Sequence, residues 1–156
     1  MPPRVYLETS VVSYLAARPS RDVVVAGHQR TTLEWWRARN RFELVISQSV
    51  LDEAGAGGPE LAQQRLSLLR DLPILDVTES AVALAESLVE TAIIPRIAAE
   101  DALHVSLAIT HGVDYLVTWN CRHIANAVIR PRIERAARDA GLLPTIICTP
   151  EELLNA

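Results

Sequence analysis

Short apolar runs alternate with longer stretches of helical periodicity along this chain. Five apolar runs, bounded by turn-forming or charged positions, predict buried strands at 4–7, 44–46, 74–77, 114–119 and 145–148. Between them, apolar residues recur at helical spacing and predict helices over about 11–15, 22–41, a short segment between 47 and 55, 60–70, 79–94, 98–111, 122–128 and 133–140, with a last helical turn from Pro150. Strands that alternate with helices predict an α/β fold with a mostly parallel sheet covered on both faces. We expect one domain over residues 1–156.

The predicted helix 98–111 differs from the others because it is apolar on nearly every side between 102 and 109. A helix of that kind is usually enclosed by other elements, so we expect it to be sandwiched. Gly112 follows it directly and is a usual residue just past a helix end.

The predicted helix 22–41 contains the adjacent pair Trp35 and Trp36, and we place Val25, Leu33 and Trp36 on its inner face. Adjacent helical residues point about 100° apart, so one monomer cannot easily bury both tryptophans. One of them belongs to the core. The other lies at a protein interface, where tryptophan is enriched, or is simply partly exposed.

Four polar side chains stand where predicted strands or helices begin or end: Glu8, Glu53, Asp101 and Asn120. The carboxyl ends of parallel strands meet at one sheet edge, where α/β proteins place their ligands. Three carboxylates gathered there would repel one another unless a cation lay between them. Mg²⁺ and Mn²⁺ prefer oxygen ligands, so the pattern indicates a metal-dependent phosphodiesterase site.

Each of these residues also has a structural interpretation. Glu8 could cap the helix that follows it, although Thr9 and Ser10 already offer capping hydroxyls. A carboxylate directly after a buried strand is costly unless it is paired or bound to metal, so we favour a functional role. Asn120 could simply turn the chain, or it could orient a metal-bound water or a carboxylate.

The two helical acids each have an acidic neighbour. Asp101 and Glu100 both suit the first turn of a helix, where the helix dipole favours negative charge. Asp101 leads into the apolar face, so we place it inward and Glu100 in solvent. Ser47 or Ser49 can cap the helix after the second strand, and Asp52 stands three residues after Ser49, as in a capping box. We therefore place Glu53 in the cleft.

Three further residues lie close to these positions. His104 follows Asp101 by three residues on the same helix face; it either supports the carboxylates or, the interpretation we favour, is a core or rim histidine satisfied locally. Arg122, just past Asn120, is either a phosphate clamp or a solvated arginine. Cys121 would need an activating base to act as a nucleophile, and only His123 is near in sequence.

Composition removes several classes of function. All fifteen basic residues are arginine, which excludes a Schiff-base lysine and a Walker-type phosphate lysine. The net charge of −4 argues against a DNA-coating protein but not against a nuclease with local arginines. No apolar run reaches the roughly 18 residues needed to span a bilayer, and the first residues do not resemble a signal peptide, so we expect a cytoplasmic protein without a membrane partner. Two cysteines without zinc or CxxC spacing make a disulfide framework unexpected.

Three segments carry a resemblance to a known family: Val-Tyr-Leu-Glu-Thr-Ser-Val-Val-Ser-Tyr-Leu at 5–15, Glu-Asp-Ala-Leu-His-Val-Ser-Leu-Ala at 100–108, and Leu-Val-Thr-Trp-Asn-Cys-Arg-His-Ile-Ala-Asn at 116–126. Together they resemble the PIN-domain family, and most closely its VapC-like toxin branch. Ser-Val-Leu-Asp-Glu at 49–53 is weak alone but falls in the right place. The resemblance covers essentially the whole chain.

The resemblance implies a three-layer α/β/α PIN-like fold with a parallel sheet of four or five strands. It also implies Mg²⁺- or Mn²⁺-dependent cleavage of RNA. In the toxin branch it implies a homodimer held inactive by a small antitoxin protein.

Matched residue by residue, Glu8, Glu53 and Asp101 fall on the family's three acids, and Asn120 falls on a fourth acid or asparagine. Ser10 falls on the hydroxyl residue that supports the first acid. We therefore hypothesise that Glu8 and Asp101 hold one Mg²⁺ or Mn²⁺ directly and that Glu53 reaches it, or a second ion, through water. Glu8 stands where aspartate is usual, and Asn120 removes a negative charge.

Two other functions remain open. One is a housekeeping RNA-processing PIN nuclease without an antitoxin. The other is a catalytically degenerate PIN module that binds RNA or protein, favoured by the departures at Glu8 and Asn120. A dinucleotide-binding fold is set aside because no GxGxxG follows the first strand.

Overall fold

A five-stranded parallel sheet forms the centre of the computed structural model, which describes residues 1–155. The sheet order is β3-β2-β1-β4-β5, with β1 Arg4–Leu7, β2 Glu43–Ser47, β3 Ile74–Leu75, β4 Tyr115–Val117 and β5 Ile146–Cys148. The central strand is β1, whose Tyr6 pairs with Val45 on one side and Leu116 on the other. The predicted parallel sheet is therefore confirmed, and all five predicted apolar runs contribute a strand.

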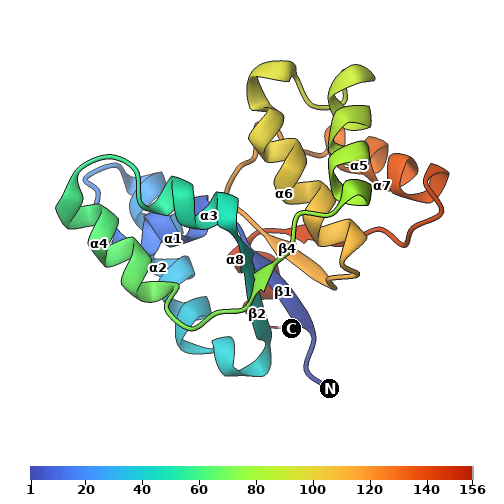
Figure 1. Cartoon of the computed structure of the whole chain (residues 1–156). Helices are drawn as coiled ribbons and strands as arrows, with labels where there is room; N and C mark the ends of the chain where they lie inside the picture. Colours follow the sequence, from blue (N-terminus) through green and yellow to red (C-terminus); the bar gives the residue numbers. More distant parts are fainter. Residues whose placement is uncertain (156) are drawn as a thin grey trace.

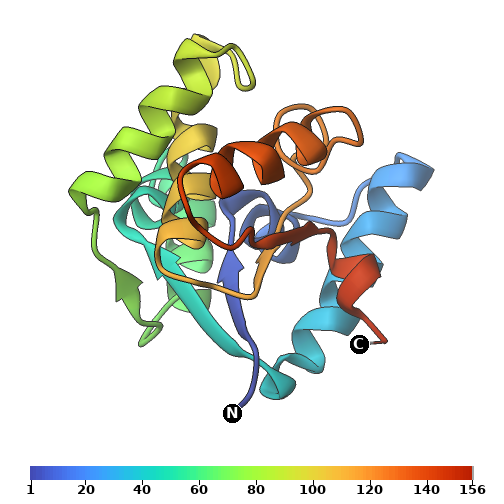
Figure 2. The same cartoon turned by 90° about the vertical axis from the view of Figure 1, so that its right-hand side faces the viewer.

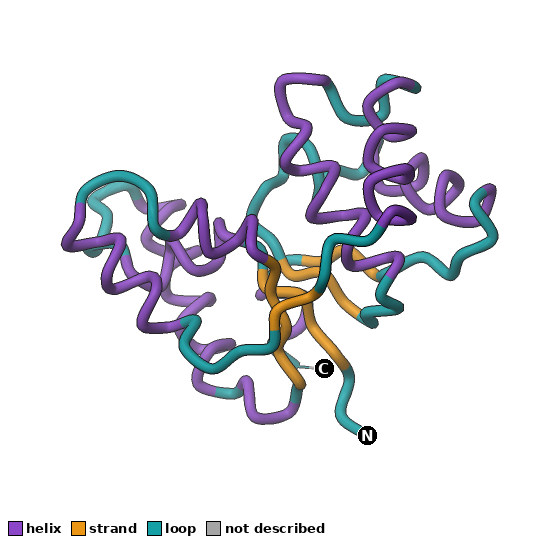
Figure 3. The backbone as a smooth tube through the Cα atoms, in the orientation of Figure 1, coloured by secondary structure: helices purple, strands orange, loops and turns teal. Residues whose placement is uncertain are grey.

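Helices cover both faces of this sheet. They are α1 Thr9–Ala16, α2 Val23–Arg37, α3 Gln48–Ala54, α4 Pro59–Leu68, α5 Glu79–Glu90, α6 Ala99–Thr110, α7 Ile129–Asp139 and α8 Pro150–Leu153, with short 3₁₀ helices at Arg39–Arg41 and Arg96–Ala98. Figure 1 shows α1 to α4 on one side of the strands and α5 to α7 on the other, and Figure 3 shows the strands in orange between these two groups of purple helices. The rotated view in Figure 2 places α8 beside α2. The fold is thus the three-layer α/β/α arrangement that was expected.

The helix α6 is enclosed as its sequence predicts. Seven of its twelve residues are buried, among them every residue from His104 to Ile109. It packs against α5 and contacts β4, so apolar neighbours meet it on more than one side. Gly112 ends this segment in the left-handed region, with φ of +66°, a conformation that glycine adopts without a steric cost.

The helix α2 buries a different face from the one predicted. Trp35 is fully buried, whereas Trp36 is partly exposed and Leu33 is 40% exposed. Thr32 is also fully buried, three residues before Trp35, so Thr32 and Trp35 lie on the buried face of α2. The guanidinium of Arg39 lies 4.2 Å from the centre of the Trp36 ring and covers part of it.

The segment 122–128 was predicted to be helical, and this was wrong. Its backbone makes successive turns, and α7 begins at Ile129 rather than at 133. Pro131 lies in the first turn of α7, where its missing N–H has no helical partner to lose. Asn126 leads into α7, because its Oδ1 accepts from the backbone N–H of Val128 at 2.9 Å.

Two smaller features complete the fold. No helix within residues 1–155 combines the length and apolarity needed to cross a membrane. Both cysteines are free thiols, with Cys121 exposed and Cys148 buried. Burial raises the pKa of the Cys148 thiol to about 12, so this residue packs as a small apolar side chain.

Candidate metal centre

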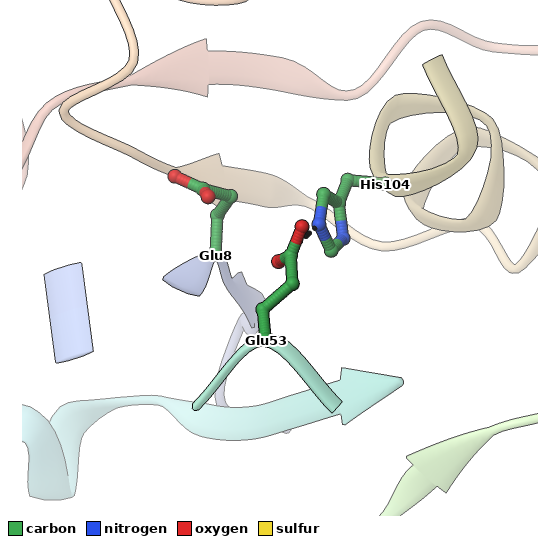
Figure 4. A group of neighbouring side chains, drawn as sticks. All are labelled: Glu8, Glu53 and His104. Carbon is green, nitrogen blue, oxygen red and sulfur yellow. Dashed lines mark hydrogen bonds and ion pairs between the residues drawn. The ribbon is translucent and has the colours of Figure 1, made fainter. Parts of the chain in front are cut away.

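The carboxyl ends of β1 and β2 bring acids from separate parts of the chain to one place. Glu8 follows β1, and Glu53 lies on α3, the helix that begins directly after β2. The ligand atoms of Glu8, Glu53 and His104 all lie within 4.8 Å of one another (Figure 4). Two of the predicted site residues therefore meet, and the third member of the group comes from α6.

Glu8 is both a helix cap and a member of this group. Glu8 is only 5% exposed, and its carboxylate accepts hydrogen bonds on both oxygens. Oε1 accepts from the Thr118 hydroxyl at 2.5 Å and from the Ser10 hydroxyl, and Oε2 accepts from the Ser10 backbone N–H at 3.1 Å. Ser10 thus contacts the first acid, as the resemblance implies. These donors fix the carboxylate and offset its burial.

Glu53 faces the group, and its neighbour Asp52 does not. The Oε1 atom of Glu53 accepts from the Thr9 hydroxyl and lies 2.8 Å from Nε2 of His104. Asp52 instead accepts from the Gln48 side chain at 2.9 Å on the exposed surface. Of the two candidate caps, Ser47 and not Ser49 caps α3, because its hydroxyl accepts from the backbone N–H of Val50, so no capping box forms between Ser49 and Asp52.

His104 is fully buried and links the acids to the core. Its Nδ1 lies 2.6 Å from the Tyr6 hydroxyl, which in turn lies 2.6 Å from the Ser47 hydroxyl. A chain of buried polar groups therefore runs from Ser47 through Tyr6 and His104 to Glu53. The preferred interpretation of His104 as a locally satisfied core histidine is only partly correct, because one of its partners is a site carboxylate.

Charge coupling between Glu53 and His104 sets their protonation. Burial raises the pKa of Glu53, but the hydrogen bond and charge of His104 and the hydrogen bond from Thr9 bring it below its ordinary value. Burial lowers the pKa of His104, but the hydrogen bond and charge of Glu53, with the charges of Glu8 and Asp101, bring it above its ordinary value. The protein thus places a protonatable imidazole among the carboxylates.

Asp101 lies beside this group without being one of its three closely spaced members. It is partly exposed in the first turn of α6, whereas Glu100 is exposed. Burial raises the pKa of Asp101, and a hydrogen bond with the Asn120 side chain and the charge of His104 lower it in part. Asp101 is therefore the inward-facing acid of the pair, close enough to His104 for their charges to interact.

Asn120 combines the two roles considered for it. Its Oδ1 accepts from the backbone N–H of His123 at 3.0 Å, which turns the chain after β4. Its own backbone N–H donates to the Thr118 hydroxyl at 2.9 Å, and its side chain is close enough to Asp101 to lower the pKa of that carboxyl. Arg122 is exposed and makes no hydrogen bond or ion pair within residues 1–155.

Four residues of the site environment were not assigned a site role from the sequence: Tyr6, Thr9, Thr118 and, in the preferred interpretation, His104. Thr9 and Thr118 have a signal that could have identified them, because each is a hydroxyl at a strand end beside a predicted site residue. Tyr6 has none, because a tyrosine inside an apolar run is usually a core residue.

The acidic group is separate from a large surface cavity elsewhere on the molecule. A cavity of about 820 Å³ between α5 and α7 is lined by none of the residues of the acidic group or its partners.

No family model matches this chain, and no match was found among curated proteins or solved structures.

Proposed function

We propose that this protein is a metal-dependent endoribonuclease that hydrolyses phosphodiester bonds of RNA. The observation that carries the proposal is the convergence of Glu8 and Glu53, with Asp101 beside them, at the carboxyl edge of a parallel sheet. Clustered carboxylates at such an edge suit a divalent cation and a phosphate substrate. The choice of RNA rests on the resemblance of segments 5–15, 100–108 and 116–126 to PIN nucleases.

The donor set fits a hard divalent ion. Oε2 of Glu53 accepts no hydrogen bond from residues 1–155, and the Glu53 side chain is 34% exposed, so one oxygen is accessible. His104 is a poorer ligand, because both of its ring nitrogens are already hydrogen-bonded. We therefore assign Glu8, Glu53 and Asp101 as the ligands and Mg²⁺ or Mn²⁺ as the ion. When bound, such an ion lowers the pKa of a coordinated water and polarises the phosphate.

The remaining residues hold the carboxylates in place. Ser10 and Thr118 restrain Glu8, while Thr9 and His104 restrain Glu53 on the opposite side of the group. Restraints of this kind orient the ligands and limit their reorganisation during the reaction.

Two further side chains act on Asp101 and on the substrate. Asn120 orients Asp101 and presents an amide to the attacking water. Arg122, which has no partner within residues 1–155, contacts the substrate phosphate.

The test is cleavage of a mixed RNA pool with Mg²⁺ or Mn²⁺, using two pairs of variants. Glu53→Gln and Asp101→Asn should each lower the rate by at least about 100-fold, because loss of even an outer partner of a metal ligand costs 10–100-fold. Their matched controls, Asp52→Asn and Glu100→Gln, remove the neighbouring exposed acids and should cleave like the wild type. EDTA should abolish all cleavage.

A binding module without catalysis is the second candidate, and one observation favours it. Hydroxyls and the Ser10 backbone N–H already hydrogen-bond both oxygens of Glu8, and Thr9 and His104 hydrogen-bond Oε1 of Glu53, so these contacts hold the acids without an ion. Thermal unfolding with added Mn²⁺ separates the two candidates. A rise in melting temperature that is lost in Glu53→Gln supports the metal site, while no rise and no cleavage support the binding module.

We also propose, from the resemblance alone, that the nuclease is the cytoplasmic, homodimeric toxin of a toxin–antitoxin pair. The alternative is a housekeeping RNA-processing nuclease. A short neighbouring gene encoding a DNA-binding protein that inhibits cleavage would support the toxin. Cleavage unaffected by any neighbouring product would support the housekeeping enzyme.

A further inference from the structure

Three aromatic rings from separate elements meet beside the candidate metal centre. His28 of α2 stacks on Trp119, with ring centres 4.1 Å apart and planes 14° apart. Tyr14 of α1 meets both rings edge-on, at 6.2 Å from His28 and 5.9 Å from Trp119. All three residues are partly exposed, so the cluster reaches the surface instead of closing the core.

Hydrogen bonds hold Trp119 rigidly and tie it to the acids. Its backbone N–H donates to the Ser10 hydroxyl at 2.8 Å, and Ser10 in turn donates to Glu8. Its indole N–H donates at 2.7 Å to the buried Thr32 hydroxyl, which bonds the carbonyl of His28 at 2.5 Å. The stacked rings are therefore fixed in place, and Trp119 directly precedes Asn120 in the sequence.

The surface of α2 next to His28 is open and apolar. Val24, one helical turn before His28, is 66% exposed, and Val23 is 85% exposed. Gly27 carries no side chain, and nothing lies within 4 Å of the position where its Cβ would be. The helix surface beside His28 is therefore open at Gly27.

We propose that Tyr14, His28 and Trp119 form a stacking platform for a nucleobase of an RNA strand whose phosphate lies at the Glu8–Glu53 group. This inference rests on the proposed function and extends it to how the strand is held. Single-stranded nucleic acids are commonly bound by aromatic side chains on which bases stack, next to the groups that contact the backbone.

A nucleotide is favoured over a protein side chain because the platform and the metal centre are continuous. Trp119 and Asn120 are adjacent in sequence, and Ser10 contacts both Trp119 and Glu8. The backbone of Trp119 is therefore two hydrogen bonds from the carboxylate of Glu8, through Ser10. A nucleotide that flanks the cleaved bond has a base for the rings and a phosphate for a cation held by the acidic group.

Binding of short RNA in EDTA tests the platform without cleavage. The probes are an RNA decamer of adenosines and an abasic ribose-phosphate decamer of the same length, measured by fluorescence anisotropy. The wild type should bind the adenosine decamer more tightly. His28→Ala and Trp119→Leu should each weaken that binding by roughly 5- to 100-fold, the range for loss of one stacked base, and leave abasic binding unchanged.

Two further variants control for folding and for general loss of aromatic surface. Trp119→Phe keeps a ring and should restore most of the binding. Trp36→Leu removes a partly exposed tryptophan that lies about 12 Å from His28 along α2, and this variant should bind like the wild type.

Equal binding of both decamers by the wild type, or unchanged binding by His28→Ala and Trp119→Leu, would overturn the proposal. The second of these results would return the rings to a packing role or to a protein partner. Because no metal is present, base-dependent binding without later cleavage would refute only the nuclease, and cleavage without base-dependent binding would refute only the platform.

Discussion

Tyr6 illustrates how a core residue determines the geometry of a surface site. Its ring is fully buried in the central strand, while its hydroxyl lies between Nδ1 of His104 and the hydroxyl of Ser47. Burial is the main reason that the pKa of Tyr6 lies above its ordinary value, so the hydroxyl stays neutral. This hydroxyl holds the imidazole ring at the angle from which Nε2 reaches Glu53.

Replacing Tyr6 with phenylalanine should therefore weaken both the fold and the metal site. The change leaves His104 and Ser47 each without a partner in a buried place, and the free energy of unfolding should fall by about 2 kcal/mol. Affinity for Mn²⁺ should also fall, because Glu53 loses its restraint. Urea unfolding and a Mn²⁺ titration measure the two effects.

Tyr115→Phe is the matched control for this prediction. Tyr115 is a partly exposed tyrosine of β4, and its hydroxyl has no hydrogen-bond partner within residues 1–155. Its removal should change stability by less than about 0.5 kcal/mol. If both variants lose the same stability and bind Mn²⁺ equally, the buried chain from Tyr6 to Glu53 does not support the site.

The acids of the site could be predicted from the sequence, but the partners of the acids could not. Glu8 and Glu53 each follow a recognisable strand, and parallel strands end at a common edge. His104 reaches Glu53 only because α6 packs with this residue inward and because Tyr6 is aligned with Val45. The local pattern of apolar residues does not show how such distant elements pack against each other.

The loop before α7 shows how an element boundary depends on one side chain. Asn126 accepts from the backbone N–H groups of Val128 and Ile129, at 2.9 and 3.3 Å, and its amide donates to the Cys121 carbonyl at 3.1 Å. These bonds satisfy backbone groups at the start of α7 and close the loop that carries Asn120.

Asn126→Ala should therefore cost about 1 kcal/mol of unfolding free energy, the usual net contribution of a side-chain hydrogen bond. Thermal or urea unfolding measures it. Asn40→Ala is the control, because Asn40 is exposed and its side chain has no hydrogen bond within residues 1–155. An equal loss in the two variants would show that Asn126 contributes no more than a surface asparagine.

The same loop explains where element prediction failed. Periodicity located every strand, since the apolar runs are short and clearly bounded, and the predicted run 4–7 matches β1. It also predicted a helix over 122–128, because Ile124, Ala125 and Val128 recur at helical spacing. Ile124 and Ala125 are indeed buried, but side-chain bonds of Asn120 and Asn126 replace the helical ladder there.

At the scale of the whole molecule, the acidic group lies where the two helical layers meet the sheet edge. Glu8 directly follows the central strand, Glu53 comes from the layer of α1 to α4, and His104 comes from the layer of α5 to α7 (Figures 1 and 4). The Glu53–His104 contact therefore joins the two layers. Its strength should affect global stability and should vary with pH.

The direction of that variation follows from the two pKa shifts. His104 has a folded-state pKa above the ordinary 6.5, so its contribution is complete below pH 6.5 and is lost as pH rises through the folded value. Glu53 has a folded-state pKa below the ordinary 4.5, so its contribution is complete above pH 4.5 and is lost as pH falls through the folded value. Both contributions are complete between pH 4.5 and 6.5.

Metal-free protein in EDTA should therefore lose stability as pH rises above 6.5, and His104→Gln should reduce this loss. The measurement is urea unfolding of both proteins from pH 5.5 to 8.5. Glu53→Gln should reduce the pH dependence in the same way, and the double variant should add nothing further, because the two residues act through one contact. A wild-type curve that stays parallel to the His104→Gln curve over this range would mean that folding leaves the pKa of His104 unchanged, whereas a wild-type curve that gains stability relative to His104→Gln as pH rises would mean that His104 is neutral in the folded protein. The carboxylates would then have to be balanced by a bound cation.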